Sequence, residues 1–324
     1  MTNASDTPSE PQYGPASAAL APRYSGVRTF ARCPHVSDLA GADVAVVGVP
    51  FDTGTSYRPG PRFGPDGIRA GSQLLRPYHP PLDIDVFGTL SVVDAGDLAV
   101  TSGNAARTLE QIAQGVEAIL RAGVVPLVLG GDHTIVLGEL RGHAAVHGPM
   151  GLILLDAHAD TWDAYFGEPY AHGTPLWHAV KEGVLDPHRS LLAGMRGSLY
   201  GPHNLGDARA MGFEVLTTEE LRATAPADFA RLVAERLGGG PAFLSFDIDV
   251  LDPAFAPATG TPEVCGLLPH EAIAFVRSLV DVPFTGFDVV EVSPPYDNAS
   301  QTTAMLAANV AYELLAIEAK RRAS

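Results

Sequence analysis

The chain has 324 residues, 46% of them hydrophobic, which is enough for one large α/β domain or two smaller ones. Asp and Glu (37) outnumber Lys and Arg (21), and the net charge of −16 argues against nucleic acid as a partner, because phosphate binding needs a basic face. An acidic balance fits a small cationic substrate, and it equally fits an ordinary acidic surface.

The remaining composition bounds the cellular setting. No apolar run approaches the roughly 20 residues that span a bilayer, so no membrane helix is expected. Only Cys33 and Cys265 occur, which excludes a disulfide framework and suits a reducing cytoplasm. Residues 1–22 lack the basic and apolar regions of a secretory signal. Their Ser, Pro, Ala and Thr content predicts a disordered tail, which we assign to residues 1–27, before a single catalytic domain at 28–324.

From residue 45 onward, short apolar runs alternate with helical segments. The runs are mostly continuously apolar, which indicates strands buried on both faces. They cover residues 45–49, 90–95, 125–129, 152–155, 191–193, 243–246 and 287–290. Apolar side chains recur at helical spacing in residues 107–123, 228–237, 269–279 and 302–321. This alternation predicts one domain built on a parallel sheet with helices on both faces.

Three of the expected strands run directly into side chains that bind metal ions. Because the carboxyl ends of parallel strands lie along one edge of a sheet, these side chains are expected to converge there. Residues two apart on a strand share a face, so the Asp-X-His-X-Asp segment at 156–160 can aim three ligands at one point. The candidate ligands are His133, Asp156, His158, Asp160, Asp247 and Asp249.

The charge of this set predicts which ions it binds. Four aspartates packed together would repel one another without cations, and two divalent ions would balance them. Carboxylate and imidazole ligands without a thiolate favour Mn²⁺ or a similar first-row ion over structural zinc. Asp132 and Asp252, which lie beside the ligands in sequence, are expected to orient them instead of binding metal. A lone buried Asp or His is more often structural, but three clusters at strand ends favour a metal centre.

At this point the chain resembles the ureohydrolase family, which includes arginase, agmatinase and guanidinobutyrase. The resemblance runs from about residue 28 to the C-terminus and is closer to agmatinase and the guanidino-acid amidinohydrolases than to arginase. The matching motifs are Gly-Gly-Asp-His-Thr at 130–134, Asp-Ala-His-Ala-Asp at 156–160, and the segments 47–52, 56–65, 245–262 and 288–294. Thr134 is a mild departure, because many relatives carry Ser there.

The resemblance implies a three-layer α/β/α fold around a mostly parallel eight-stranded sheet and a site with two Mn²⁺ ions. It implies that His133 and Asp160 are terminal ligands of one ion, and that His158 and Asp249 are terminal ligands of the other. Asp156 and Asp247 would bridge both ions. The family also implies a homo-oligomer, a trimer or a hexamer. The cytoplasmic location is expected from the cysteine content alone.

The expected chemistry is attack of water on a guanidinium group, which is a poor electrophile because its charge is delocalised. Metal coordination lowers the pKa of water from 15.7 to about 7 and so supplies a nucleophile. His172 is the candidate proton shuttle, since an imidazole suits reversible proton transfer, although a surface loop histidine is the plainer interpretation. Glu291 is the candidate partner of the substrate guanidinium through charge-assisted hydrogen bonds, or alternatively an ordinary acidic residue at the start of a loop.

The preferred substrate is agmatine, cleaved to putrescine and urea, with Asp163 or Glu168 near its cationic tail. The alternative is a guanidino acid such as 4-guanidinobutyrate, whose carboxylate would need Arg58, Arg196 or backbone donors. Two other classes stay open: a deacetylase-type or phosphoesterase metal hydrolase on a related sheet, and a non-catalytic protein on the same scaffold. The second would have lost a ligand, whereas all six ligands are present.

Overall fold

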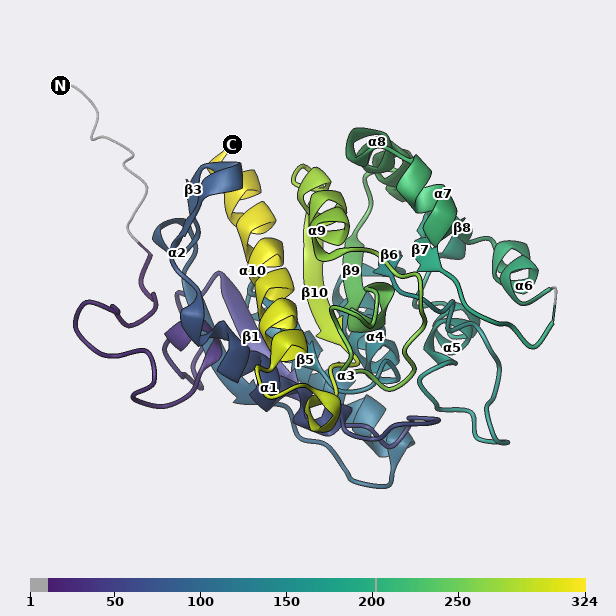
Figure 1. The fold of residues 1–324 in the computed structure, drawn as a ribbon, viewed down its shortest axis with the longest axis horizontal. Coiled ribbons are helices and arrows are strands. Elements are labelled where there is room, and N and C mark those ends of the chain that lie inside the picture. The colour runs from purple at the N-terminus through teal and green to yellow at the C-terminus, as the bar shows by residue number, and fades with distance from the viewer. Residues whose placement is uncertain (1–10, 202) are drawn as a thin grey trace.

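The computed structural model describes residues 11–201 and 203–324. Its centre is an eight-stranded sheet in which every neighbouring pair is parallel (Figure 1). In spatial order the strands are β4 (Val92–Asp97), β1 (Val44–Val49), β5 (Val125–Gly130), β10 (Phe284–Val290), β9 (Ala242–Asp247), β6 (Gly151–Leu155), β7 (Leu191–Met195) and β8 (Glu214–Thr217).

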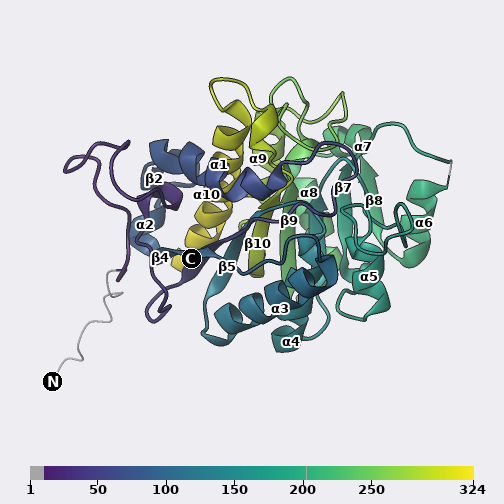
Figure 2. The ribbon, with the colours of Figure 1, turned by 90° about the horizontal axis from the view of Figure 1, so that it is seen from below.

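Helices cover both faces of this sheet, which gives three layers (Figure 2). One face is covered by α3 (Ala105–Arg121), α4 (Ile135–His147) and α5 (Pro175–Lys181), next to α6 (Asn204–Met211). The other face is covered by α1 (Gly64–Gly71), α10 (Thr302–Ala323), α9 (Pro269–Ser278) and α8 (Pro226–Leu237), with α7 (Thr218–Ala223) beside them. The predicted α/β/α architecture with a parallel eight-stranded sheet is therefore confirmed.

Shorter elements complete the described chain. A small antiparallel hairpin pairs β2 (Tyr78–His79) with β3 (Ile84–Asp85), followed by α2 (Val86–Thr89). Single 3-10 turns span Phe30–Arg32, Pro61–Phe63, Ser72–Leu74, Pro80–Leu82, Pro187–Arg189, Ile248–Val250 and Pro294–Tyr296. Across the described residues, none of the helices has the length and apolarity needed to cross a bilayer.

Each expected strand and helix is present, with its ends shifted by a few residues. The strands β2, β3 and β8 and the helices α1, α2 and α4 to α7 were not expected, and β8 and α4 show why. The edge strand β8 is short and only partly buried, so it lacks the continuous apolar run of the central strands. Helix α4 is buried on nearly every side, so its apolar residues do not recur at the spacing that marks a one-sided helix. Burial from all directions removes the periodic signal on which sequence-based prediction depends.

The predicted tail at 1–27 extends across residues 1–10, which lie outside the described part of the chain. Residues 11–27 contain no helix or strand, but part of this stretch contacts the domain. The Tyr13 N–H donates to Ser91 Oγ at 3.0 Å, and the Ala16 N–H donates to the Arg32 carbonyl at 3.1 Å. Polar contacts therefore tie residues 13–16 to the folded chain.

Glu313 on α10 joins the β2–β3 hairpin to α9. His79 Nδ1 accepts the Leu82 N–H, so its Nε2 carries the proton that it donates to Glu313 at 3.0 Å. Arg277 on α9 donates to both carboxylate oxygens, at 2.8 and 2.6 Å. Burial by itself would raise the pKa of Glu313, but the hydrogen bonds from His79 and Arg277 outweigh burial and lower it. The ionised form is therefore favoured in the folded chain.

We expect Glu313→Gln to destabilise the fold by about 1–2 kcal/mol at pH 7, because Arg277, whose side chain is 32% exposed, loses the counter-charge of a buried carboxylate. The pKa of Glu313 is lower in the folded chain than its unfolded value of about 4.3. The contribution of Glu313 to the free energy of unfolding is therefore present above pH 4.3 and is lost as the pH falls through the folded pKa. Thermal unfolding should show a difference from the parent chain that shrinks in acid. The exposed Glu235→Gln is the matched control. An equal difference at every pH would contradict the assignment.

Candidate metal centre

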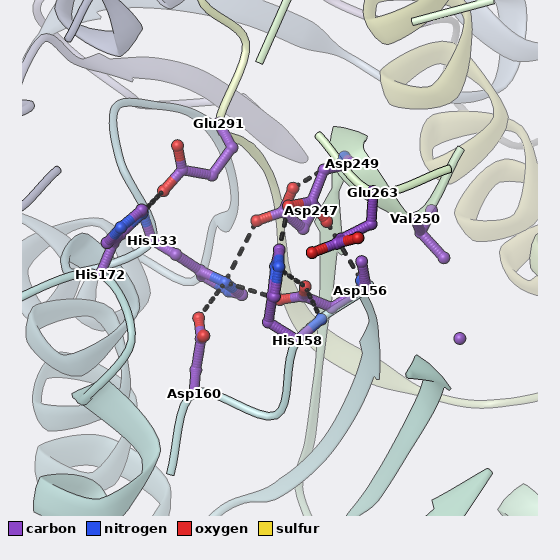
Figure 3. Close-up of polar contacts among 12 residues, drawn as sticks. His133, Asp156, His158, Asp160, His172, Asp247, Asp249, Val250, Glu263 and Glu291 are labelled. Carbon is purple, nitrogen blue, oxygen red and sulfur yellow. Dashed lines mark hydrogen bonds and ion pairs between the residues drawn. The ribbon is translucent and has the colours of Figure 1, made fainter. Parts of the chain in front are cut away.

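Four adjacent strands at the middle of the sheet, β5, β10, β9 and β6, deliver the predicted site residues to one edge (Figure 3). His133 follows β5, Glu291 follows β10, and Asp247 ends β9, with Asp249 in the 3-10 turn after it. The segment 156–160 follows β6. Strands that lie far apart in sequence are neighbours in space, which is why these side chains meet.

The turn that carries His133 depends on a glycine. Gly131 has φ +33°, and a Cβ there would lie 2.6 Å from the Val49 carbonyl oxygen of the neighbouring strand. Only glycine can pass this point without pushing β1 and β5 apart. Asp132 then accepts hydrogen bonds from the Gly54 N–H at 2.8 Å and the Thr134 N–H at 3.0 Å, which holds the turn in place.

His133 directs one ring nitrogen at three carboxylates. Its Nδ1 lies 3.0 Å from Asp156 Oδ2, 2.9 Å from Asp160 Oδ2 and 3.4 Å from Asp247 Oδ2 (Figure 3). Two of the carboxylates follow β6 and the third ends β9, whereas His133 follows β5. The structure therefore brings His133 together with Asp156, Asp160 and Asp247.

A buried relay behind His133 sets which nitrogen carries the proton. Ser245 Oγ donates to Asp288 Oδ1 at 2.7 Å, so the hydroxyl must accept from His133 Nε2, 3.0 Å away. The proton then resides on Nε2, and Nδ1 presents its lone pair to the carboxylates. Metal-binding histidines are commonly oriented by such a second hydrogen bond. Neither Ser245 nor Asp288 was expected from sequence as a partner of the site.

The second half of the site is built on His158. Its Nδ1 lies 3.0 Å from Asp249 Oδ2 and 3.6 Å from Asp156 Oδ1. Ligand atoms of His133, Asp156 and Asp160 lie within 4.8 Å of one another, and so do those of Asp156, His158 and Asp249. Asp156 is shared by both groups, so the two halves adjoin. All six predicted ligands lie together.

The donor set fits two cations. His133 Nδ1, Asp156 Oδ2 and Asp249 Oδ2 are buried and have no hydrogen-bond partner among the described residues. Leaving such atoms unsatisfied costs roughly 1–3 kcal/mol each, and more when they are charged. Burial first, and then the neighbouring Asp249 and Asp156 carboxylates, raise the pKa of Asp247 well above its ordinary value. Two divalent ions would satisfy these atoms and offset the repulsion.

Beside the ligands, His172 and Glu291 form a pair. His172 Nδ1 lies 2.9 Å from Glu291 Oε1, which also accepts the His133 N–H at 2.8 Å. The second carboxylate oxygen, Oε2, is buried and has no partner among the described residues. Burial lowers the pKa of His172, but the charge and hydrogen bond of Glu291 and the charges of Asp132 and Asp160 together outweigh burial and raise this pKa to about 9. The two predicted catalytic residues therefore lie together at the metal centre.

A cavity of about 390 Å³ opens above the ligands. Its outer wall is aromatic, with the rings of Trp162 and Tyr165 stacked at 5.2 Å and Tyr200 hydrogen-bonded to Tyr165 at 2.9 Å. Asp163, predicted to bind substrate, is exposed and does not line the cavity, since its neighbours Trp162 and Tyr165 occupy the inner side of the loop. Glu168 is also exposed and outside the lining.

Arg196 lines the cavity, but its donors are committed elsewhere. Its Nε, Nη1 and Nη2 all donate to backbone carbonyls, which belong to Gly194, Asp249, Val250, Leu251, Glu263 and Val264. A guanidinium has five N–H donors, and these contacts occupy them. Arg58 lies outside the lining, with its guanidinium 5.4 and 5.3 Å from the Tyr57 and Tyr296 rings. Neither arginine is placed to hold a substrate carboxylate.

Comparison with known proteins now settles the family. The sequence pattern of the arginase family matches residues 42–316. The chain belongs to this family. It is 44% identical to the guanidinobutyrase of Pseudomonas aeruginosa, over 91% of this chain and 93% of that protein. It is 43% identical to the mitochondrial agmatinase of Gallus gallus, over 94% of this chain and 89% of that protein. The solved structure of the Streptomyces clavuligerus proclavaminate amidino hydrolase superposes with a TM-score of 0.88 at 40% identity, covering 93% of this chain and all of that one.

Arginase-family membership fixes the class of reaction. This chain is a hydrolase that acts on C–N bonds of guanidino compounds, and the family depends on a binuclear metal centre. The clustered His and Asp side chains of this chain could hold such a centre. The deacetylase-type alternative from the sequence is thereby set aside.

Proposed function

We propose that this chain hydrolyses agmatine to putrescine and urea with two Mn²⁺ ions. The observation that carries the proposal is the charge of the cavity beyond the metal ligands. Glu263 lines it, whereas Arg196, the one Lys or Arg in the described lining, has its donors occupied. A cationic tail can pair directly with the Glu263 carboxylate, whereas a carboxylate tail meets an Arg196 that keeps its charge but has its N–H donors directed at backbone carbonyls.

The position of Glu263 supports this proposal. Its side chain lies against Gly197, where a Cβ would come within 2.6 Å of either carboxylate oxygen, so the glycine makes room for it. Glu263 lines the same cavity as the predicted metal ligands His158 and Asp247, and Figure 3 draws it with them. The aromatic wall adds a surface for an alkyl ammonium, since a cation over an aromatic face gains about 0.5–2 kcal/mol.

The chain's own residues divide the remaining work. In this proposal His133 and Asp160 would hold one ion, His158 and Asp249 would hold the other, and Asp156 and Asp247 would serve both. The bound ions would supply Lewis acidity and an activated water. The unpartnered Glu291 Oε2 accepts N–H groups of the substrate guanidinium and so orients it. His172, protonated at neutral pH under the influence of Glu291, delivers a proton to the departing amine.

Manganese, assembly and location belong to the same proposal. The mixed carboxylate and imidazole donors favour Mn²⁺ among first-row ions. The homo-oligomer is carried over from the family resemblance, and the cytoplasmic location from the two cysteines.

A guanidino acid is the second candidate, favoured by a specific observation. The relative that is 44% identical is named guanidinobutyrase, and a Pseudomonas aeruginosa guanidinopropionase is 42% identical. If this chain shares that preference, backbone or hydroxyl groups must hold the carboxylate, because Arg196 has no donor left.

Urea release by the manganese-loaded chain should be measured for agmatine, 4-guanidinobutyrate, 3-guanidinopropionate and arginine. We expect the highest kcat/KM with agmatine. Glu263→Gln removes the charge and keeps the shape, so it should raise KM for agmatine by about tenfold and leave that for 4-guanidinobutyrate unchanged or lower it. A preference for 4-guanidinobutyrate in the parent chain would replace the substrate assignment and leave the reaction class intact.

A further inference from the structure

Ser56 is a cavity-lining hydroxyl that the chemistry above does not use. It lies in the loop after β1, 116 residues before His172 in sequence. Its Oγ lies 2.6 Å from His172 Nε2, and its backbone N–H donates to the same nitrogen at 3.1 Å. Since Glu291 takes Nδ1, Ser56 provides the partner of the other ring nitrogen.

The loop that carries Ser56 is held at both sides. The His172 N–H donates to the Gly54 carbonyl at 3.0 Å, and the Gly54 N–H donates to Asp132 Oδ2 at 2.8 Å. A Cβ at Gly54 would overlap Thr134 Oγ1 and would lie 3.2 Å from His172 N, so the close approach of the two segments favours glycine. Ser56 therefore meets the imidazole from a segment fixed against the metal-binding turn.

The two donors of Ser56 behave differently when His172 gains a proton. A backbone N–H only donates, so it pairs with Nε2 only when that nitrogen carries a lone pair. A hydroxyl both donates and accepts, so by rotating it stays bonded to Nε2 in either protonation state. The Ser56 backbone N–H therefore disfavours the protonated imidazole, which Glu291 favours. The Ser56 hydroxyl offsets this, because its oxygen accepts a hydrogen bond from the protonated Nε2.

We infer that Ser56 is a positioning residue: its hydroxyl accepts from the protonated Nε2 of His172 until that proton passes from Nε2 to the departing amine, and then rotates to donate to the Nε2 lone pair. This inference rests on the proposed function, because it assigns His172 a proton to deliver. Ser56 acts through His172 and forms no bond to substrate. It keeps the imidazole plane aligned with the cavity while Glu291 holds the opposite nitrogen.

The charged groups that face His172 determine whether its pKa rises or falls when the Ser56 hydroxyl is removed. The carboxylates of Glu291, Asp132 and Asp160 all favour the imidazolium. In Ser56→Ala these charges remain and the opposing N–H remains, but the hydroxyl that accepts from the protonated Nε2 is lost. The imidazolium is then less stable, and the pKa of His172 falls. If the proton donor is the imidazolium, the alkaline limb of the kcat–pH profile moves to lower pH.

The kinetic test compares Ser56→Ala, Ser56→Thr and a matched hydroxyl deletion, Thr53→Ala, at an exposed position of the same loop. We expect Ser56→Ala to lose about 10- to 100-fold in kcat with KM nearly unchanged, because a small displacement of a catalytic group costs rate. Ser56→Thr should restore most of the rate, and bound metal and melting temperature should stay at parent values. Parent-like kcat in Ser56→Ala, or no rescue by Thr, overturns the inference.

A second readout needs no substrate. In the magnesium-loaded chain, which is diamagnetic, ¹⁵N spectra of labelled histidines report the protonation of each ring nitrogen, and His172→Asn assigns the signal. We expect the His172 signals to shift in Ser56→Ala and to stay unchanged in Thr53→Ala. Identical His172 signals in Ser56→Ala and the parent chain would refute the contact. A chain that cleaves no guanidino compound but shows the shift would refute the proposed function and leave the contact standing.

Discussion

Asp247→Ala is expected to abolish turnover and to reduce bound metal below two ions per chain. Asp247 is buried at the end of β9, and its Oδ2 lies 3.4 Å from the nitrogen of His133 that faces the ligand cluster. Its other oxygen accepts the Asp249 N–H at 2.8 Å, so the substitution also frees the turn that positions a second ligand. A bridging ligand that is lost weakens both ion sites together.

Metal content by mass spectrometry and urea release should be measured on the same preparation. Asp281→Ala, an exposed aspartate outside the site, is the matched control and should keep both ions. Two bound ions with full activity in Asp247→Ala would refute the bridging assignment. A melting temperature close to that of the metal-free parent chain would show that the variant is folded.

His172→Asn is expected to lower kcat by about 100- to 10,000-fold while leaving two metal ions bound, which is the range for loss of a general acid. The imidazole contacts Glu291 and Ser56 and is not one of the six ligands, so the site should still fill. Asn keeps a polar side chain but cannot carry a proton at neutral pH.

Steady-state kinetics with a parallel metal analysis separates this result from simple unfolding. The exposed His270→Asn is the matched control, since it makes the same change away from the cavity. Unchanged turnover in His172→Asn would remove the imidazole from the mechanism. Loss of metal in that variant would mean that His172 supports the ligands instead.

Much of the site was readable from the sequence because its signals are local. The segment 156–160 follows a continuously apolar run, and parallel strands place such tails at one edge of the sheet. The same reasoning located His133 and Asp247, and the structure brings all six ligands together. The apolar run that marks each strand and the metal-type side chains that follow it are only a few positions apart in the sequence.

Other partners could not be read in this way. Ser245 faces His133 because β9 and β5 both flank β10, and Ser56 reaches His172 across 116 residues. Asp163 was predicted to bind substrate from its place in a loop near the ligands, but the direction of a loop side chain depends on how the loop packs. Arg196 was a candidate for a carboxylate until its contacts with backbone carbonyls were seen.

The amino-acid sequence by itself determined the alternating α/β pattern, the six metal-type ligands and the kinship with guanidino hydrolases, because periodicity and spacing act over a few residues. Only the tertiary structure decided the proton-bearing nitrogen of His133, the partner of His172 and the charge of the cavity wall around Glu263. These depend on contacts between residues far apart in the chain, whose distance in space is set by the order of strands in the sheet.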